Sequence, residues 1–115
     1  MNILKLAISV IILFCTTSTV NALTIPEYEK MKKDDIDILK LYLLGVGRGY
    51  TWSNILAKKE HNVSLFCPPN NLVLNGDNYI SIIDMELEAE NNFKDNFEVE
   101  VILLVTLQET FPCEE

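Results

Sequence analysis

Residues 34–59, DDIDILKLYLLGVGRGYTWSNILAKK, decide the fold of this chain. The segment opens on two aspartates and closes on two lysines, which matches the polarity of the helix macrodipole. One set of apolar residues recurs at helical spacing, namely Ile36, Leu39, Leu43, Val46 and Tyr50. A second set lies outside that stripe, namely Ile38, Leu41, Tyr42 and Leu44. The segment therefore predicts a long helix that is central to a bundle or lies in a subunit interface.

Three glycines, Gly45, Gly47 and Gly49, interrupt this helical pattern. Each costs about 1 kcal/mol relative to alanine inside a helix, so some packing feature must offset them. Gly45 and Gly49 are four residues apart and share a face. We expect another backbone or a large ring, such as Trp52 or Tyr79, to approach that face closely. A phosphate-binding loop would need Gly-x-Gly-x-x-Gly after a strand, which is not the pattern here.

Two further helices are predicted on either side of a long connection. Thr24-Ile25-Pro26-Glu27 is typical of a capped helix start, and a short helix to about Lys33 follows. Residues 60–77 are rich in turn-forming residues and predict a connection fastened to the core. The next segment, from Asp77 to about Glu90, predicts a helix with Asp77 as its cap. Its apolar face comprises Tyr79, Ile80, Ile83 and Leu87.

The last segment, residues 97–111, is ambiguous from local sequence. Phe97-Glu98-Val99-Glu100-Val101 alternates like a strand, and residues 97–107 cannot be assigned from propensity alone. A solitary strand among helices would leave its backbone groups without partners, so a buried closing helix ended by Pro112 is the better interpretation. The expected fold class is an all-α, small compact bundle of four to five helices.

The first 22 residues predict a cleavable signal peptide. Lys5 precedes an apolar run from Leu6 to Cys15, and Val20-Asn21-Ala22 is typical of a cleavage site. The alternative, a lipoprotein acylated at Cys15, is disfavoured because bulky Phe14 precedes that cysteine. The apolar run is also too short to span a bilayer, so we expect no membrane segment after cleavage. Residues 23–115 are then one exported domain.

Charge and cysteine content limit the partners and the compartment. The formal net charge of the chain is −8, and it becomes −9 when Lys5 is removed with the signal peptide. An acidic surface of this kind argues against nucleic acid and anionic membranes as partners and favours basic clefts on proteins. Two cysteines remain, Cys67 and Cys113, and in an oxidising compartment they predict a disulfide. A zinc site with His61 is the weaker alternative because the spacing lacks paired ligands.

Several short motifs along the chain resemble those of a known family. These motifs are Tyr42-Leu43-Leu44-Gly45-Val46-Gly47-Arg48-Gly49, Trp52-Ser53-Asn54, Phe66-Cys67-Pro68-Pro69 and Phe111-Pro112-Cys113. With this order and spacing the chain resembles the Rap/Tai family of small periplasmic immunity proteins of type VI secretion, over about residues 39–113. The resemblance implies a helical domain, commonly a homodimer, that binds and blocks a peptidoglycan amidase. It implies no cofactor and no enzymatic activity of its own.

The residues themselves carry no recognised catalytic constellation. The single histidine, His61, is accompanied by no Gly-x-Ser-x-Gly and no His-Glu-x-x-His motif, so no catalytic or metal residues are assigned. For partner binding we select acids and an aromatic residue around the predicted third major helix and its following turn. They are Asp84, Glu86, Glu88, Glu90, Phe93 and Asp95. Opposite charges there would speed encounter with a basic cleft, although a merely solvated helix face is the simpler alternative.

The function expected from these observations is a periplasmic immunity protein that occludes the active site of an amidase. Three alternatives remain open. A general envelope-stress chaperone would show holdase activity on acidification. An accessory subunit of an envelope assembly would sit in a large constitutive complex, and an enzyme would turn over a substrate unaided.

Overall fold

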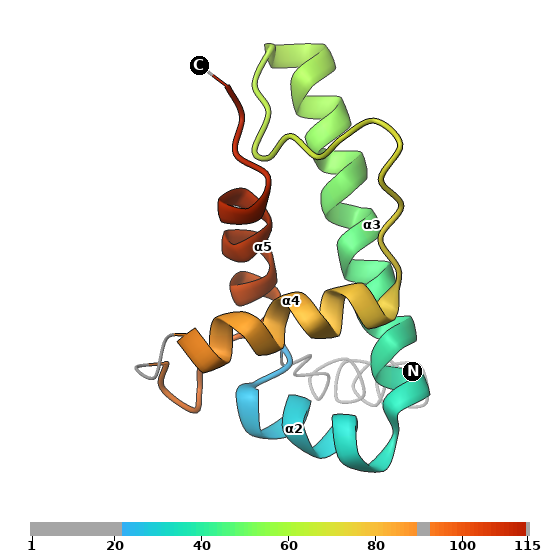
Figure 1. The fold of residues 1–115 in the computed structure, drawn as a ribbon, viewed down its shortest axis with the longest axis vertical. Helices are drawn as coiled ribbons and strands as arrows, with labels where there is room; N and C mark the ends of the chain where they lie inside the picture. The colour runs from blue at the N-terminus through green and yellow to red at the C-terminus, as the bar shows by residue number, and fades with distance from the viewer. Residues whose placement is uncertain (1–21, 90–92, 115) are drawn as a thin grey trace, which may run out of the picture.

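The computed structural model describes residues 22–89 and 93–114. In these ranges the chain forms four helices and no β-strand, namely α2 (Ile25–Asp34), α3 (Ile36–His61), α4 (Gly76–Ala89) and α5 (Val99–Thr110) (Figure 1). The predicted all-α fold is confirmed. Within this part of the chain no helix is both long and apolar enough to cross a membrane. The predicted signal peptide lies, except for Ala22, outside the described residues and stays a prediction.

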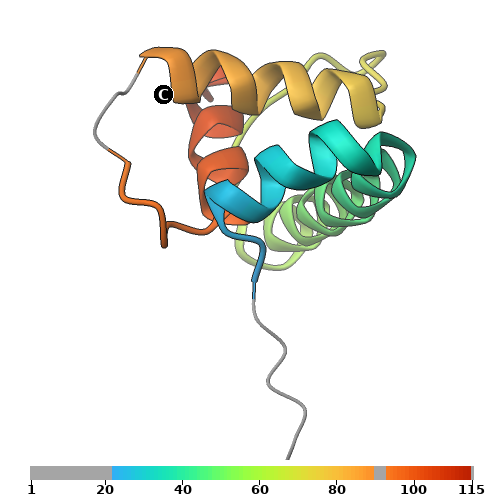
Figure 2. The ribbon, with the colours of Figure 1, turned by 90° about the horizontal axis from the view of Figure 1, so that it is seen from below.

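The helix α4 holds the other helices together. It crosses α3 and α5 at a steep angle (Figure 1), and α2 lies beside it at one end of α3 (Figure 2). Side chains from every helix and from the connection after α3 meet in one core. The buried members are Tyr28, Leu39, Leu43, Phe66, Tyr79, Ile82, Ile83, Val99, Ile102, Leu103 and Leu107.

The start of α2 is built as the sequence predicts. The carboxylate of Glu27 accepts hydrogen bonds from the backbone N–H of Thr24 at 2.9 Å and from its hydroxyl at 2.7 Å. The backbone hydrogen bond from Thr24 is the main reason that the pKa of Glu27 is lowered. Thr24 also forms an antiparallel bridge with Glu98, so the beginning of α2 is tied to the beginning of α5.

The predicted cap of α4 is wrong by two residues. Asn75 takes that place instead of Asp77, and α4 begins at Gly76. The side-chain oxygen of Asn75 accepts from the backbone N–H of Asn78 at 3.0 Å, and the side-chain oxygen of Asn78 accepts from the backbone N–H of Asn75 at 2.9 Å. This reciprocal pair is an asparagine version of a capping box. Asp77 instead forms an ion pair with Lys40 of α3 at 2.8 Å.

The ambiguous last segment is helical, as the requirement for satisfied backbone groups predicts. α5 buries Val99, Ile102, Leu103 and Leu107 against the core, and its internal hydrogen bonds satisfy the buried backbone. The hydroxyl of Thr106 is buried as well and donates to the carbonyl of Ile102 at 2.8 Å. Tertiary burial therefore outweighs the local strand propensity of the β-branched residues.

The disulfide predicted between Cys67 and Cys113 is present. Their Cα atoms are 5.0 Å apart, and the bond joins the connection after α3 to the chain beyond α5. The backbone N–H of Cys67 also donates to the carbonyl of Phe111 at 2.8 Å. Because both sulfurs are bonded to each other, the alternative zinc site with His61 is wrong. Within the described residues no cluster of three or more potential ligands could hold a metal ion.

The glycine that admits a ring is Gly47, so the helix-packing prediction for Gly45, Gly49 and Trp52 is corrected. A Cβ atom at Gly47 would overlap the ring of Tyr79 from α4, whereas one at Gly45 or Gly49 would meet no atom of the described residues within 4 Å. Trp52 does not pack there either, because it is 64% exposed. The reason is the position of α4, which crosses the side of α3 opposite to the Gly45 face.

The three glycines allow a matched test of this close approach. We expect Gly47→Ala to lower the free energy of unfolding by about 2 kcal/mol, because the added methyl group overpacks the contact with Tyr79. Gly45→Ala, in open space on the same helix, should raise it by about 0.5–1 kcal/mol. Urea unfolding of both variants measures the difference. Equal effects of the two substitutions would contradict the packing of Tyr79 on Gly47.

The contribution of the disulfide can be measured separately. It closes a loop with a sequence separation of 46 residues, for which the chain-entropy account gives a stabilisation of about 4 kcal/mol. We expect the Cys67→Ser/Cys113→Ser variant and the reduced wild-type chain to lose similar free energies of unfolding. Both side chains are at exposed positions, so serine introduces no buried polar group. A loss below about 1 kcal/mol would show that the link constrains the unfolded chain little.

Candidate functional site

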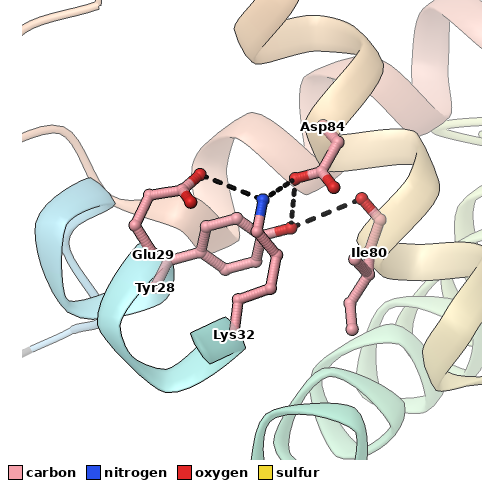
Figure 3. A network of polar contacts seen from close by, with 5 residues as sticks. All are labelled: Tyr28, Glu29, Lys32, Ile80 and Asp84. Carbon is pink, nitrogen blue, oxygen red and sulfur yellow. Dashed lines mark hydrogen bonds and ion pairs between the residues drawn. The ribbon is translucent and has the colours of Figure 1, made fainter. Parts of the chain in front are cut away.

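The predicted acidic surface on α4 divides into residues with different roles. Asp84 is engaged inside the protein, where its Oδ1 atom accepts from the hydroxyl of Tyr28 at 2.7 Å and forms an ion pair with Lys32 at 2.9 Å (Figure 3). Lys32 also contacts Glu29 on α2 at 3.2 Å, and the Tyr28 hydroxyl lies 3.4 Å from the carbonyl of Ile80. Asp84 is therefore a clamp between α2 and α4, and its side chain, which is 32% exposed, stays only a predicted contact for a partner.

Burial and the clamp change the proton affinities of the residues that face Asp84. Burial raises the pKa of Tyr28, and the hydrogen bond to Asp84 raises it further. Burial lowers the pKa of Lys32, but hydrogen bonds to Asp84 and Glu29 outweigh this, so that pKa is raised overall. Because the pKa of Tyr28 rises on folding, its stabilisation is complete below the ordinary value of 10.0 and is lost as the pH rises above it.

The other selected residues lie at or beyond the end of α4. Glu88 and Asp95 are exposed, and Glu86 is partly buried and takes part in an interaction of its own. Phe93 packs against Phe97 with ring centroids 5.2 Å apart. Glu90 lies outside the described residues. An acidic contact surface around Glu88 and Asp95 stays a prediction.

Removing the hydroxyl of Tyr28 tests the clamp. We expect Tyr28→Phe to lower the free energy of unfolding at pH 7 by about 2 kcal/mol, because a hydrogen bond to a carboxylate is lost beside a buried ring. Lys32→Ala should cost less than about 1 kcal/mol, because the lysine side chain is 29% exposed and solvent screens its ion pairs. Thermal and urea unfolding measure both. If Lys32→Ala costs more stability than Tyr28→Phe, the ion pair, and not the tyrosine hydrogen bond, is the main link between α2 and α4.

A second surface, which the sequence did not indicate, lies between α3 and the connection after it. Two adjoining hollows of about 420 and 340 Å³ share Thr51, Ile55 and Leu72 and form one groove. We call it the α3 groove. Its walls also include Arg48, Trp52, Lys58 and Val73. Val73 is 83% exposed, so the groove has apolar side chains standing at its rim.

The side chain of Asn54 holds the groove in shape. Its amide group donates to the carbonyl of Phe66 at 2.7 Å, and its oxygen accepts from the backbone N–H of Leu65 at 2.6 Å. The Asn54 side chain thus pairs with backbone groups of the connection and holds the connection against α3. Phe66 is buried in the core, and Cys67 follows it in the disulfide. The wall of the groove that the connection forms is thus held to α3 by hydrogen bonds and to the end of the chain by the disulfide.

The groove differs in charge from the rest of the chain. Its lining residues include Arg48 and Lys58 but no aspartate or glutamate, although the whole chain has a formal charge of −8. Trp, Tyr and Arg are the residues most enriched at energetically dominant positions of protein interfaces. Arg48, Trp52 and Tyr79 lie together along one stretch of the groove. This composition suits an apolar protein segment that carries a carboxylate.

The sequence contained part of this signal. Trp52 and Asn54 belong to a motif of the family resemblance, but we interpreted Trp52 as a packing residue. Periodicity places Trp52 on α3 without telling which side of α3 the later helices cover. Val73 and Leu72 belong to a connection of 14 residues between α3 and α4, whose path no local pattern determines.

Comparisons with known proteins supply no relative for this arrangement. No protein-family model, no curated protein and no solved structure matches the chain.

Proposed function

We propose that this protein is a periplasmic immunity protein, which binds a peptidoglycan amidase delivered by type VI secretion and occludes its active site. The observation that carries the proposal is the α3 groove with Trp52 exposed beside Arg48. The motifs that resemble those of the Rap/Tai family support it, since Trp52 and Asn54 stand in one of them and Cys67 and Cys113 in two others. The protein acts by binding and needs no cofactor.

The exposed apolar side chains favour a protein as the ligand of the α3 groove. A tryptophan that is 64% exposed has a large area to bury on association. Ile55 and Val73 flank it and would exclude water around the contact, as the surroundings of dominant interface residues do. Burial of about 800 Å² per partner is typical of a stable inhibitor complex, so the contact would extend beyond the groove.

The charges assign different roles to the two surfaces. Glu88 and Asp95 contribute to an acidic field that would steer the protein toward a basic substrate cleft on the amidase. Arg48 or Lys58 would then meet a carboxylate on an apolar loop at the edge of that cleft. Affinity comes mainly from the buried apolar anchors, and the acids affect the rate of association and its salt dependence.

The homodimer implied by the family resemblance is part of the proposal. Light scattering of the purified, oxidised chain measures its mass directly. A dimer that keeps the α3 groove accessible is compatible with inhibition, since each copy then offers one complete contact surface.

Truncation of the anchor tests the proposed function. With an amidase that the protein inhibits, sought first in the adjacent reading frame, we expect Trp52→Ala to weaken inhibition by about 30-fold, which corresponds to about 2 kcal/mol. Leu41→Ala serves as the matched control, because Leu41 is an equally exposed apolar residue of α3 that does not line the groove. It should leave inhibition unchanged. Inhibition of peptidoglycan hydrolysis, measured over a range of inhibitor concentrations, gives both values.

Other outcomes would favour the alternatives. Unchanged inhibition by Trp52→Ala would remove the α3 groove from the contact surface. Absence of any binding to an amidase, together with holdase activity that appears only on acidification, would indicate an envelope-stress chaperone. Isolation in a large constitutive complex would indicate an accessory subunit.

A further inference from the structure

The backbone nitrogen of Leu23 lies against a carboxylate from the far end of the chain. It donates to Oε1 of Glu100 at 3.0 Å, across a sequence separation of 77 residues. Backbone hydrogen bonds between residues 23–24 and residues 98–99 fix the position of this nitrogen. The carbonyl of Leu23 accepts from the N–H of Val99 at 2.8 Å, and Thr24 bridges to Glu98. The geometry therefore sets Leu23 opposite Glu100 through backbone register.

The carboxylate of Glu100 is incompletely satisfied. Oε1 also accepts a hydrogen bond from the hydroxyl of Tyr42. The second oxygen, Oε2, is buried and has no hydrogen-bond partner among residues 22–89 and 93–114. No lysine or arginine of the described residues forms an ion pair with Glu100. A buried carboxylate oxygen without a partner is rare in proteins and calls for a further donor.

We propose that cleavage of the Ala22–Leu23 peptide bond supplies this donor, so that the new α-ammonium group of Leu23 forms an internal ion pair with Glu100. The inference depends on export and processing, which belong to the proposed function. Hydrolysis adds one water molecule, leaves the carboxylate on Ala22 and converts the Leu23 amide nitrogen to an ammonium group. One N–H donor thereby becomes three, with a positive charge, next to an oxygen that lacks a partner.

The pairing requires cleavage at this bond. One additional residue would move the ammonium group by about 3.8 Å and leave an amide at Leu23. Loss of Leu23 would remove both the donor and the carbonyl that accepts from Val99. The precursor thus lacks the ion pair, and before export it also lacks the Cys67–Cys113 bond. Both links between distant parts of the chain arise only after the protein reaches its compartment.

The pH dependence of the ion pair follows from the groups around it. Tyr42 and Tyr50 of α3 face Glu100, and Glu98 precedes α5. Charged residues Glu27, Lys30, Asp34 and Asp35 line a hollow beside Ala22 and Leu23. An unpaired α-amino group has a pKa of about 7.7–8.0, and pairing raises it. The stabilisation is therefore complete below about pH 7.7 and is lost as the pH rises through the raised pKa.

The tyrosines do not obscure this window. Burial raises the pKa of Tyr42 and of Tyr50 above the ordinary value of 10.0, with Glu100 contributing to both. In the unfolded chain these tyrosines ionise around pH 10, so their effect on stability sets in close to that pH. A loss of stability between about pH 8 and 9 therefore reports the α-amino group.

The test compares two oxidised chains that differ by one residue, one beginning at Leu23 and one retaining Ala22. With ¹⁵N-labelled leucine, NMR titration of the chain beginning at Leu23 should give an α-amino pKa at least about one unit above 7.7–8.0. Its unfolding equilibrium constant at pH 7 should be about tenfold smaller than that of the Ala22 chain, since one unit corresponds to a factor of ten. Above the raised pKa the two constants should converge.

Glu100→Gln completes the comparison, because glutamine keeps the shape of the side chain without its charge. In this variant the α-amino pKa should return to about 7.7–8.0, and the two chain starts should be equally stable. If the variant does not fold, the wild-type pair of chains still decides the question. An ordinary α-amino pKa in the folded wild-type chain, or equal stability of its two forms at pH 7, would overturn the proposal.

Failure of this inference is distinguishable from failure of the proposed function. Mass spectrometry of the exported protein shows where the chain begins. A start other than Leu23 would overturn the ion pair, whereas inhibition of an amidase would be unaffected. Conversely, if the protein inhibits no amidase but the pKa of the Leu23 amino group is raised, the proposed function fails and the ion pair stands.

Discussion

The packing of α4 across α3 and α5 is the constraint on which the rest of the structure depends. The ring of Tyr79 fits where Gly47 has no side chain, and Gly76 at the start of α4 lies so close to Lys40 of α3 that a Cβ atom there would also overlap it. These two contacts let the helices approach closely enough for Ile82 and Ile83 to complete the core. The position of α4 then decides which side of α3 is buried and which is left to form the α3 groove.

The ends of the domain are attached to this core by different kinds of bonds. Near the beginning, backbone pairing with residues 98 and 99 holds Leu23 and Thr24, and the clamp around Asp84 joins α2 to α4. At the other end, the disulfide joins residues 67 and 113. A chain this small buries a modest share of its unfolded surface, so such links contribute a large part of its net stability.

These attachments also explain how the α3 groove, which we propose as a binding surface, can form beside a connection without regular secondary structure. Asn54 bonds the backbone at Leu65 and Phe66, and the disulfide restrains the next residue. The groove wall is therefore ordered before any partner arrives, which reduces the entropy that association must overcome. This preorganisation supports the proposal that the protein acts by binding a partner.

The sequence by itself determined the helices, because their signals are local. Helical periodicity, the Thr24–Glu27 cap and the charged ends of residues 34–59 predict elements close to the observed α2, α3 and α4. The predicted exported domain has two cysteines, so only one intramolecular disulfide was possible. The closing helix required a global argument, because Val99, Val101 and Val105 favour a strand locally.

Only the tertiary structure decided which faces meet. Residues on both sides of α3 are apolar, so no pattern could show that Gly47 would accept Tyr79 while Trp52 stays exposed. From the sequence alone, Asp84 is indistinguishable from the other acidic residues expected on the surface. Glu100 is one polar residue in a segment where polar and apolar residues alternate. Their roles depend on Tyr28 and Leu23, which are more than 50 residues away along the chain. Contacts of that kind arise from packing, which local periodicity does not encode.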